Sequence, residues 1–179
     1  MLKTYTFILL LLSSLLTAQE IKGNLQDTNN TTNQNNTIKA DDDNDNIENT
    51  IDKCPNTPQG VCVDQYGCTQ IIKRVIYFHT ESFKINKDEA KKIDDIIEIA
   101  KECYGYKLEI RGHTDSVADE TYNNLLSKQR AMTIKKIFIL HNINDQRVTT
   151  SWFGESKPST TNVSDDGKSK NRRVEVIFK

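Results

Sequence analysis

From residue 71 to the end of the chain, hydrophobic positions recur at spacings that predict alternating strands and helices. Residues 71–78 are rich in β-branched side chains, which is typical of a strand. Asn86 and Glu89 are spaced as a helix capping box, and apolar residues recur at helical spacing after them. The apolar positions are Ala90, Ile93, Ile96, Ile97 and Ala100. We expect a helix that packs this face on a sheet and ends at Gly105.

The strand–helix order then repeats. The remaining expected elements are a strand over 107–112, a helix over 120–140, a strand over 148–153, a polar loop over 154–170 and a strand over 173–178. On the second helix Ile134, Ile137 and Phe138 must face the core, and Asn142 is expected to be its left-handed cap. The order β-α-β-α-β-β predicts an α/β fold, an α+β sandwich in which two long helices pack on a mixed four-stranded sheet.

The N-terminal 40 residues have a different character. Residues 1–18 combine Lys3, a short apolar run and small residues before Gln19, which predicts a secretory signal peptide. The apolar run is short for a membrane span, so no retained transmembrane segment is expected. Residues 19–40 are rich in Asn, Thr and Gln, which predicts a disordered tether. We therefore expect an exported, periplasmic protein.

The net charge and the cysteine content limit the classes of partner to be expected and the chemistry of the cysteines. The chain of 179 residues has a formal net charge of −1, which gives no reason to expect a nucleic acid or an anionic membrane surface as a partner. Its four cysteines are Cys54, Cys62, Cys68 and Cys103. An even number in an exported chain favours disulfides over a zinc site. Four cysteines allow three pairings, and spacing alone leaves the choice open.

Residues 41–52 carry oxygen-bearing side chains at alternate positions, which is the pattern of an EF-hand calcium loop. The ligands expected at loop positions 1, 3, 5, 7, 9 and 12 are Asp41, Asp43, Asp45, the carbonyl of Ile47, Asn49 and Asp52. Asn46 stands where glycine is usual and tolerates the left-handed conformation required there. Ca²⁺ is the cofactor expected at this loop. The alternative is a solvated acidic linker.

The continuation of this loop carries Cys54-Pro55, Pro58 and Gly67-Cys68. With the aspartates before it, this pattern resembles a thrombospondin type 3 repeat, here one copy over residues 41–70. The resemblance implies a Cys54–Cys68 bridge and leaves Cys62 with Cys103 as the second pair. A small disulfide and calcium-loop module is thus expected before the α/β domain.

The loop after the strand over 107–112 carries Asp115, and Asn123, Ser127 and Arg130 share one face of the helix that follows. This polar face is expected to be free near the helix start. Arg130 can hold a carboxylate through two parallel hydrogen bonds, and Asp115 suits an ammonium group. The pair matches the amino-acid end of a ligand. The alternative is that the two side chains form a salt bridge with each other.

A catalytic alternative would pair His113 with Asp115, or with Ser127 or Cys103. No nucleophile elbow surrounds any serine, and a single histidine beside a turn is usually a scaffold residue. No catalytic residues are therefore expected, and the protein is not expected to be an enzyme.

Five motifs, in order, resemble the OmpA-like C-terminal domain over residues 71–179. They are Gly112-His113-Thr114-Asp115, Tyr122-Asn123, Leu126-Ser127-Lys128-Gln129-Arg130-Ala131, Gly154-Glu155-Ser156-Lys157-Pro158 and Asn171-Arg172-Arg173-Val174-Glu175. The resemblance implies non-covalent binding of peptidoglycan through the diaminopimelate of its stem peptide. Asp115 would hold the ammonium and Arg130 the carboxylate, and the remaining implied pocket residues are Thr114, Asn123, Arg172 and Phe78. It also implies a location at the outer membrane and cell wall, with outer-membrane proteins as further partners.

The chain departs from the family pattern at two places. His79-Thr80-Glu81 follows Phe78 where the family usually has an acid, and Val117-Ala118-Asp119 replaces a usual glycine after the Asp115 loop. A freestanding exported module is expected, because too few residues precede residue 71 to build a barrel. A calcium-stabilised envelope interaction or adhesion module is the alternative function, and a cell-wall hydrolase is the less favoured one.

Overall fold

The computed structural model describes residues 40–179, so the expected signal peptide and all but the last residue of the expected tether lie outside this part. The elements are β1 (Ile72–Tyr77), α1 (Lys87–Glu102), β2 (Leu108–Gly112), α2 (Glu120–Leu140), the 3₁₀ turn η1 (Asp145–Arg147), β3 (Val148–Trp152), α3 (Asp165–Asn171) and β4 (Arg173–Phe178). The predicted order of the four strands and two long helices is confirmed, and the predicted strands agree within one residue at each end. Among the described residues, no helix is both long and apolar enough to cross a membrane.

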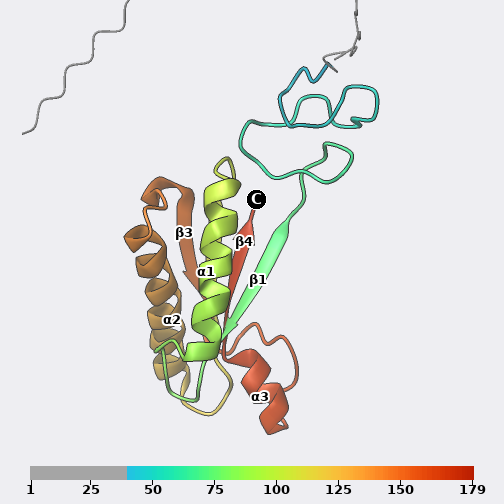
Figure 1. Ribbon diagram of the computed structural model, residues 1–179. Coiled ribbons are helices and arrows are strands. Elements are labelled where there is room, and N and C mark those ends of the chain that lie inside the picture. The colour runs from blue at the N-terminus through green and yellow to red at the C-terminus, as the bar shows by residue number, and fades with distance from the viewer. Residues whose placement is uncertain (1–39) are drawn as a thin grey trace, which may run out of the picture. The chain divides into compact units, whose positions relative to one another are not determined.

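The four strands form one sheet in the order β1-β4-β2-β3. Strand β4 is antiparallel to β1 and β2, and β2 is parallel to β3, so the sheet is mixed as predicted. Helices α1 and α2 cover one face of it (Figure 1). Because β4 lies between β1 and β2, the chain after β1 and the chain after β2 both meet the start of β4. The Phe78 N–H donates to the Arg172 carbonyl (2.8 Å), and the His113 N–H donates to the Arg173 carbonyl (2.9 Å).

The core lies between the sheet and these two helices. Its fully buried side chains include Ile76, Ile96, Ile97, Leu108, Ile110, Ile134, Phe138, Val174, Val176 and Phe178. Asn86 caps α1 by accepting the Glu89 N–H (2.8 Å), and Asn142 has the expected left-handed backbone (φ 66°) after α2. Helix α1 ends at Glu102, before Gly105, with Cys103 as its cap.

One prediction on α1 is wrong, since Ala90 is exposed and Glu89 is buried instead. Glu89 accepts the backbone N–H of Tyr77 at the end of β1 (3.1 Å) and pairs with Lys92 (2.7 Å). These contacts turn the carboxylate of Glu89 toward the sheet. The apolar periodicity had predicted that Ala90 would take this buried position.

Helix α3 lies in the stretch expected to be a loop. Ser164 caps it by accepting the Gly167 N–H (3.1 Å). Asn171 at its end accepts the N–H groups of Ser159 (2.8 Å) and Thr160 (3.1 Å), which ties the preceding loop to the helix. The helix has almost no apolar residues, so hydrophobic periodicity could not predict it. It places Lys170 and Arg172 beside the end of β1.

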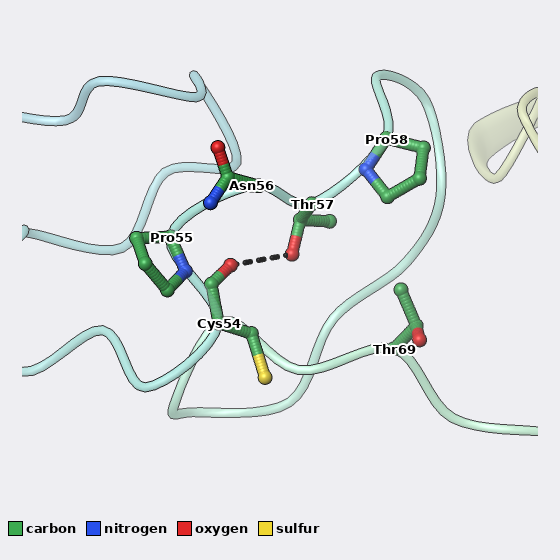
Figure 2. A pocket seen from close by; sticks show the side chains of 6 residues that line it. All are labelled: Cys54, Pro55, Asn56, Thr57, Pro58 and Thr69. Atoms are coloured by element: carbon green, nitrogen blue, oxygen red, sulfur yellow. Dashed lines mark hydrogen bonds between the residues drawn. The ribbon is translucent and has the colours of Figure 1, made fainter.

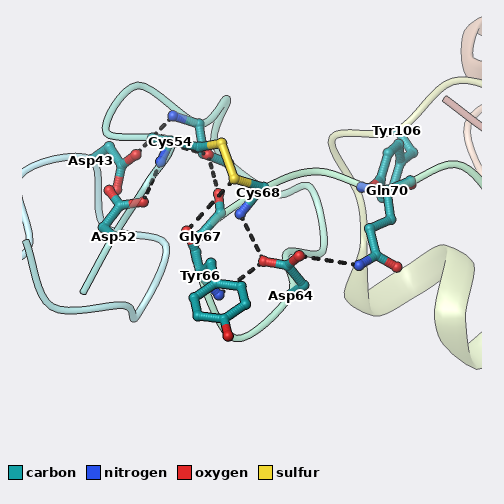
Figure 3. The surroundings of a disulfide bond; sticks show 10 residues. Asp43, Asp52, Cys54, Asp64, Tyr66, Gly67, Cys68, Gln70 and Tyr106 are labelled. Atoms are coloured by element: carbon teal, nitrogen blue, oxygen red, sulfur yellow. Dashed lines mark hydrogen bonds between the residues drawn. A yellow bond between two sulfur atoms is a disulfide. The ribbon is translucent and has the colours of Figure 1, made fainter.

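The segment before β1 contains no helix or strand among its described residues and is held by cross-links. Disulfides Cys54–Cys68 (Figure 3) and Cys62–Cys103 are both formed, which confirms the predicted pairing. Thr57 donates its hydroxyl to the Cys54 carbonyl (3.0 Å) in the proline-flanked turn (Figure 2). The buried Tyr106 contributes a hydroxyl that contacts the Cys62 carbonyl (2.8 Å), so the segment is bound to the α/β domain both covalently and by hydrogen bonding.

Candidate functional site

The predicted ligand-binding residues meet at the edge where β1 and β2 end and β4 begins. Gly112, the last residue of β2, packs directly against the Ser127 carbonyl of α2, which leaves no room for a Cβ. This close approach of strand and helix brings the loop after β2 over α2. As a result Asp115, Arg130, Phe78 and Arg172 come from four segments to one place.

Arg130 is fully buried, contrary to the expectation that this face of α2 is free. Its guanidinium donates to three backbone carbonyls, from Nε to Ser82 (2.8 Å), from Nη1 to His113 (2.8 Å) and from Nη2 to His79 (3.1 Å). Burial lowers the pKa of Arg130 to about 10, so it stays charged at neutral pH. A guanidinium has five N–H groups, so two remain beyond these three hydrogen bonds.

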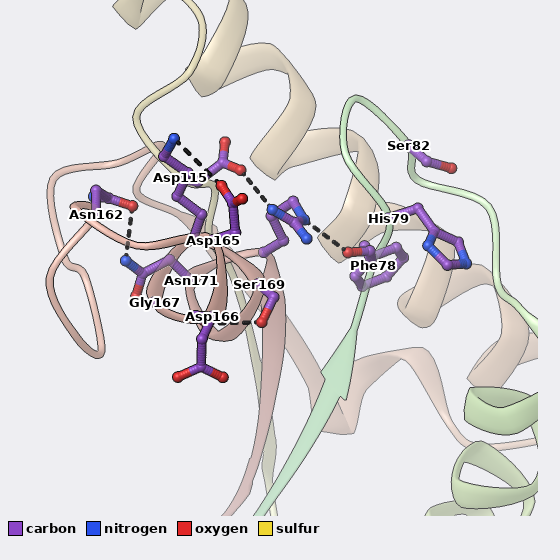
Figure 4. A network of polar contacts seen from close by, with 12 residues as sticks. Phe78, His79, Ser82, Asp115, Asn162, Asp165, Asp166, Gly167, Ser169 and Asn171 are labelled. Carbon is purple, nitrogen blue, oxygen red and sulfur yellow. Dashed lines mark hydrogen bonds and ion pairs between the residues drawn. The ribbon is translucent and has the colours of Figure 1, made fainter.

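Asp115 pairs with Arg172 and not with Arg130. The alternative considered from the sequence, a salt bridge between Asp115 and Arg130, is therefore wrong. The Arg172 Nη1 lies 2.9 Å from Asp115 Oδ2, and both side chains are largely buried. Arg172 also donates from Nε to the Phe78 carbonyl (3.1 Å), and Figure 4 shows Asp115 and Phe78 on opposite sides of a guanidinium. The Phe78 ring centroid lies 5.2 Å from the guanidinium carbon of Arg130. The site thus contains one buried carboxylate, one buried guanidinium and one partly buried guanidinium.

Thr114 and Asn123 have different surroundings. The Thr114 hydroxyl is buried and has no partner in the described chain. The Asn123 amide donates to the Ala118 carbonyl (3.0 Å) and to Glu155 Oε2 (2.7 Å), so its donors already hold two loops together. The start of α2 is covered by these loops, which is why the polar face is buried.

The residues of the catalytic alternative all have structural contacts. The His113 ring is buried and stacks on Phe153 (5.4 Å between centroids). Burial lowers the pKa of His113 to about 4, so the ring is uncharged at neutral pH. Cys103 is bonded to Cys62, and the Ser127 hydroxyl donates to the Asn124 carbonyl (2.8 Å).

The aspartates at loop positions 1, 3, 5 and 12 share one arrangement. Each uses one carboxylate oxygen to accept a backbone N–H. The pairs are Asn46 to Asp41, Thr57 to Asp43, Ile47 to Asp45 and Cys54 to Asp52. The other oxygen of each, Asp41 Oδ1, Asp43 Oδ1, Asp45 Oδ2 and Asp52 Oδ2, is buried without a partner in the described chain.

The four carboxylates converge. Oxygens of Asp41, Asp43 and Asp45 lie within 4.8 Å of one another, and the carboxylates of Asp45 and Asp52 both pack against Gly67. Burial, together with the charges of the other aspartates, raises the pKa of Asp45. Asn46 has the left-handed backbone expected of it (φ 71°). This donor set fits a hard divalent cation such as Ca²⁺.

The side chain expected at loop position 9 has another contact. The Asn49 side-chain oxygen accepts the Asp42 N–H (3.0 Å), so it braces the loop itself. The expected Ile47 carbonyl ligand stays a prediction.

Comparison with known proteins gives one family and several relatives. The profile of the OmpA family matches residues 77–172. The chain is 32% identical over 145 residues to outer membrane porin F of Pseudomonas aeruginosa, which covers 78% of this chain and 41% of the porin. It is 32% identical over 103 residues to the peptidoglycan-associated lipoprotein of Buchnera aphidicola, which covers 58% of this chain and 60% of the lipoprotein. The chain thus spans less than two thirds of either relative.

A solved structure is also similar. The C-terminal domain of Helicobacter pylori MotB superposes with a TM-score of 0.56 at 27% identity, over 59% of this chain and 84% of that domain. The porin match covers more of this chain than residues 71–179, so it extends into the segment that precedes the domain.

Proposed function

This chain belongs to the OmpA family, and from that premise we propose that it binds peptidoglycan non-covalently through the diaminopimelate of the stem peptide. One relative is named as peptidoglycan-associated, which supports the polymer as the ligand. The observation that carries the proposal is the buried Asp115 carboxylate beside the buried guanidinium of Arg130 and the partly buried guanidinium of Arg172. Asp115 lies near enough to Arg130 to act on its pKa, as does Arg172.

The proposed binding mode uses both ends of an amino acid. The ligand ammonium is held by Asp115, and the ligand carboxylate meets the two remaining N–H groups of Arg130. Arg172, which is paired with Asp115 in the ligand-free arrangement, adds a second cation beside the carboxylate. Charge-assisted hydrogen bonds at buried sites are strong and directional, so this arrangement favours a zwitterionic group over a simple amine.

Sedimentation with purified cell-wall sacculi tests the proposal. We expect the protein to pellet with sacculi and to be released by free meso-diaminopimelate. Cadaverine is the matched competitor, because it keeps the spacing between the two amines of diaminopimelate and lacks both carboxylates. It is therefore a simple amine and should not release the protein. Failure to pellet, or equal release by cadaverine, contradicts the proposal. Release of soluble wall fragments would support the hydrolase alternative instead.

The proposed setting is the outer envelope. We propose that the protein is exported, that residues 19–40 act as a tether, and that partners in the outer membrane hold the protein while the domain binds the wall. Similarity to an outer membrane porin supports this setting. The proposed role is a non-enzymatic link between outer envelope and cell wall.

We also propose that residues 41–52 bind Ca²⁺. The four buried carboxylate oxygens without partners favour this reading, because unpaired charges at such short separations repel one another. Asp41, Asp43, Asp45 and Asp52 would supply the ligands, and the thrombospondin type 3-like segment would be ordered by the ion. In the alternative function, this module is itself an envelope interaction or adhesion surface.

Calcium is expected to raise the unfolding temperature of the protein relative to a chelator. At a free Ca²⁺ concentration of 100 times Kd, the expected gain in unfolding free energy is about 2.7 kcal/mol. Asp45→Asn should lose this gain, because it removes one of the buried charges. Asp42→Asn is the matched control, since Asp42 lies in the same loop and is exposed. Thermal denaturation with and without Ca²⁺ measures the effect.

Two results would count against this site or its proposed role. An equal calcium effect in wild type and Asp45→Asn would place the ion elsewhere. Loss of sacculus binding in chelator, with Asp115 and Arg130 intact, would favour the interaction-module alternative as a contributor.

A further inference from the structure

A groove of about 350 Å³ lies next to the Asp115–Arg172 pair, between the end of β1 and helix α3. Its lining residues are Tyr77, Phe78, His79, Asn86, Ser169, Lys170 and Arg172. None of these described lining residues is acidic, and two are permanently cationic at neutral pH. The groove is therefore suited to an anionic group.

The groove is continuous with the diaminopimelate site because Phe78 and Arg172 line both. Arg172 uses Nε on the Phe78 carbonyl and Nη1 on Asp115, which leaves three of its five N–H groups. The Phe78 ring lies against Arg130 within the diaminopimelate site and also forms a wall of the groove. A ligand held by Asp115 and Arg130 would therefore extend its neighbouring groups into the groove.

Lys170 is the second cation of the groove. It pairs with Asp166 on the same helix (2.7 Å), and its side chain is 54% exposed. An ammonium group has three N–H donors, so this pairing leaves two for a ligand. Asp166 does not line the groove, and Figure 4 shows Asp166 next to Ser169 on α3.

We propose that this groove binds a second carboxylate of the same stem peptide, the free carboxylate of the glutamate that adjoins diaminopimelate. Lys170 and Arg172 would pair with it, and the aromatic rings of Tyr77 and Phe78 would pack against the peptide backbone. The inference rests on the proposed function, because it assumes that the diaminopimelate lies at Asp115 and Arg130.

The test compares two stem tripeptides that differ in one group. One carries the free glutamate carboxylate, and in the other this carboxylate is amidated. By titration calorimetry, we expect the wild type to bind the acid about two- to fivefold more tightly than the amide, the range expected of a half-exposed ion pair. Lys170→Gln should weaken this preference, because Arg172 is then the one cation left among the lining residues of the groove. Lys168→Gln is the matched control, because Lys168 lies on the same helix, pairs with Asp165 and does not line the groove.

The outcomes separate this inference from the proposed function. If the wild type binds both tripeptides equally and free diaminopimelate still competes, the groove inference is overturned and the proposed function stands. If the wild type binds neither tripeptide nor diaminopimelate, both fail. If Lys168→Gln loses the preference as fully as Lys170→Gln, the effect is one of general surface charge and the groove inference is overturned.

Discussion

Asp115→Asn is expected to abolish sedimentation with sacculi while the domain stays folded. The change keeps the shape of the side chain and removes its charge, so the ligand ammonium loses its partner and Arg172 loses its counter-ion. Truncating one member of a buried charge pair typically costs about 2–5 kcal/mol, which is about 30-fold or more in Kd. Titration with free diaminopimelate measures the loss directly.

Asp119→Asn is the matched control for this variant. Asp119 lies in the same loop and caps α2 by accepting the Tyr122 N–H (2.9 Å), a contact that asparagine also makes. It removes the same charge without touching the proposed site. Binding that persists in Asp115→Asn, or that falls equally in Asp119→Asn, would contradict the role assigned to Asp115.

Arg130→Met is expected to destabilise the domain as well as abolish binding. The change removes the Arg130 donor from the carbonyls of Ser82, His113 and His79, of which His79 still accepts the Ser82 N–H (3.3 Å). A buried carbonyl left unpaired costs about 1–3 kcal/mol, so we expect a loss of about 2 kcal/mol or more from the carbonyls of His113 and Ser82. For a domain of this size the melting temperature should fall by about 6 °C or more. Circular dichroism melting of the purified protein checks this.

Arg147→Met separates the two effects of the Arg130 change. Arg147 also donates to three backbone carbonyls, those of Tyr106, Ala100 and Cys103, and it does not belong to the proposed site. We expect it to lower the melting temperature and to retain sacculus binding at a temperature where both variants are folded. An Arg130→Met protein that melts like the wild type would show that the three carbonyl contacts contribute little.

The burial of Arg130 changes how its role is understood. The sequence placed it on a polar helix face, and a polar face is ordinarily solvated. In the folded chain this face is covered by loops that follow β1, β2 and β3, and the carbonyls of two of those loops satisfy the guanidinium. The same side chain therefore orders the loops, and the proposed function assigns its two remaining N–H groups to the ligand carboxylate.

Local features of this protein were determined by the sequence itself. Strand and helix periodicity, the Asn86 cap and the left-handed Asn142 depend on neighbouring residues, and the structure confirms them. The alternate aspartates over residues 41–52 are also local, so their spacing alone indicated which carboxylates would converge. The resemblance to a known repeat supplied the disulfide pairing, which is confirmed.

Contacts between distant residues were decided only by the tertiary structure. Asp115 pairs with Arg172 because β4 inserts between β1 and β2, and these residues are 57 positions apart. Helix α3 is short and polar, so no hydrophobic pattern indicated it, and its placement of Lys170 beside the end of β1 could not be inferred. Asp115 and Arg130 were recognisable by the chemistry of their side chains, and Phe78 and Arg172 only by the family resemblance. The strand order brings these four side chains together and places the groove beside them, because the segments that carry them meet at one edge of the sheet.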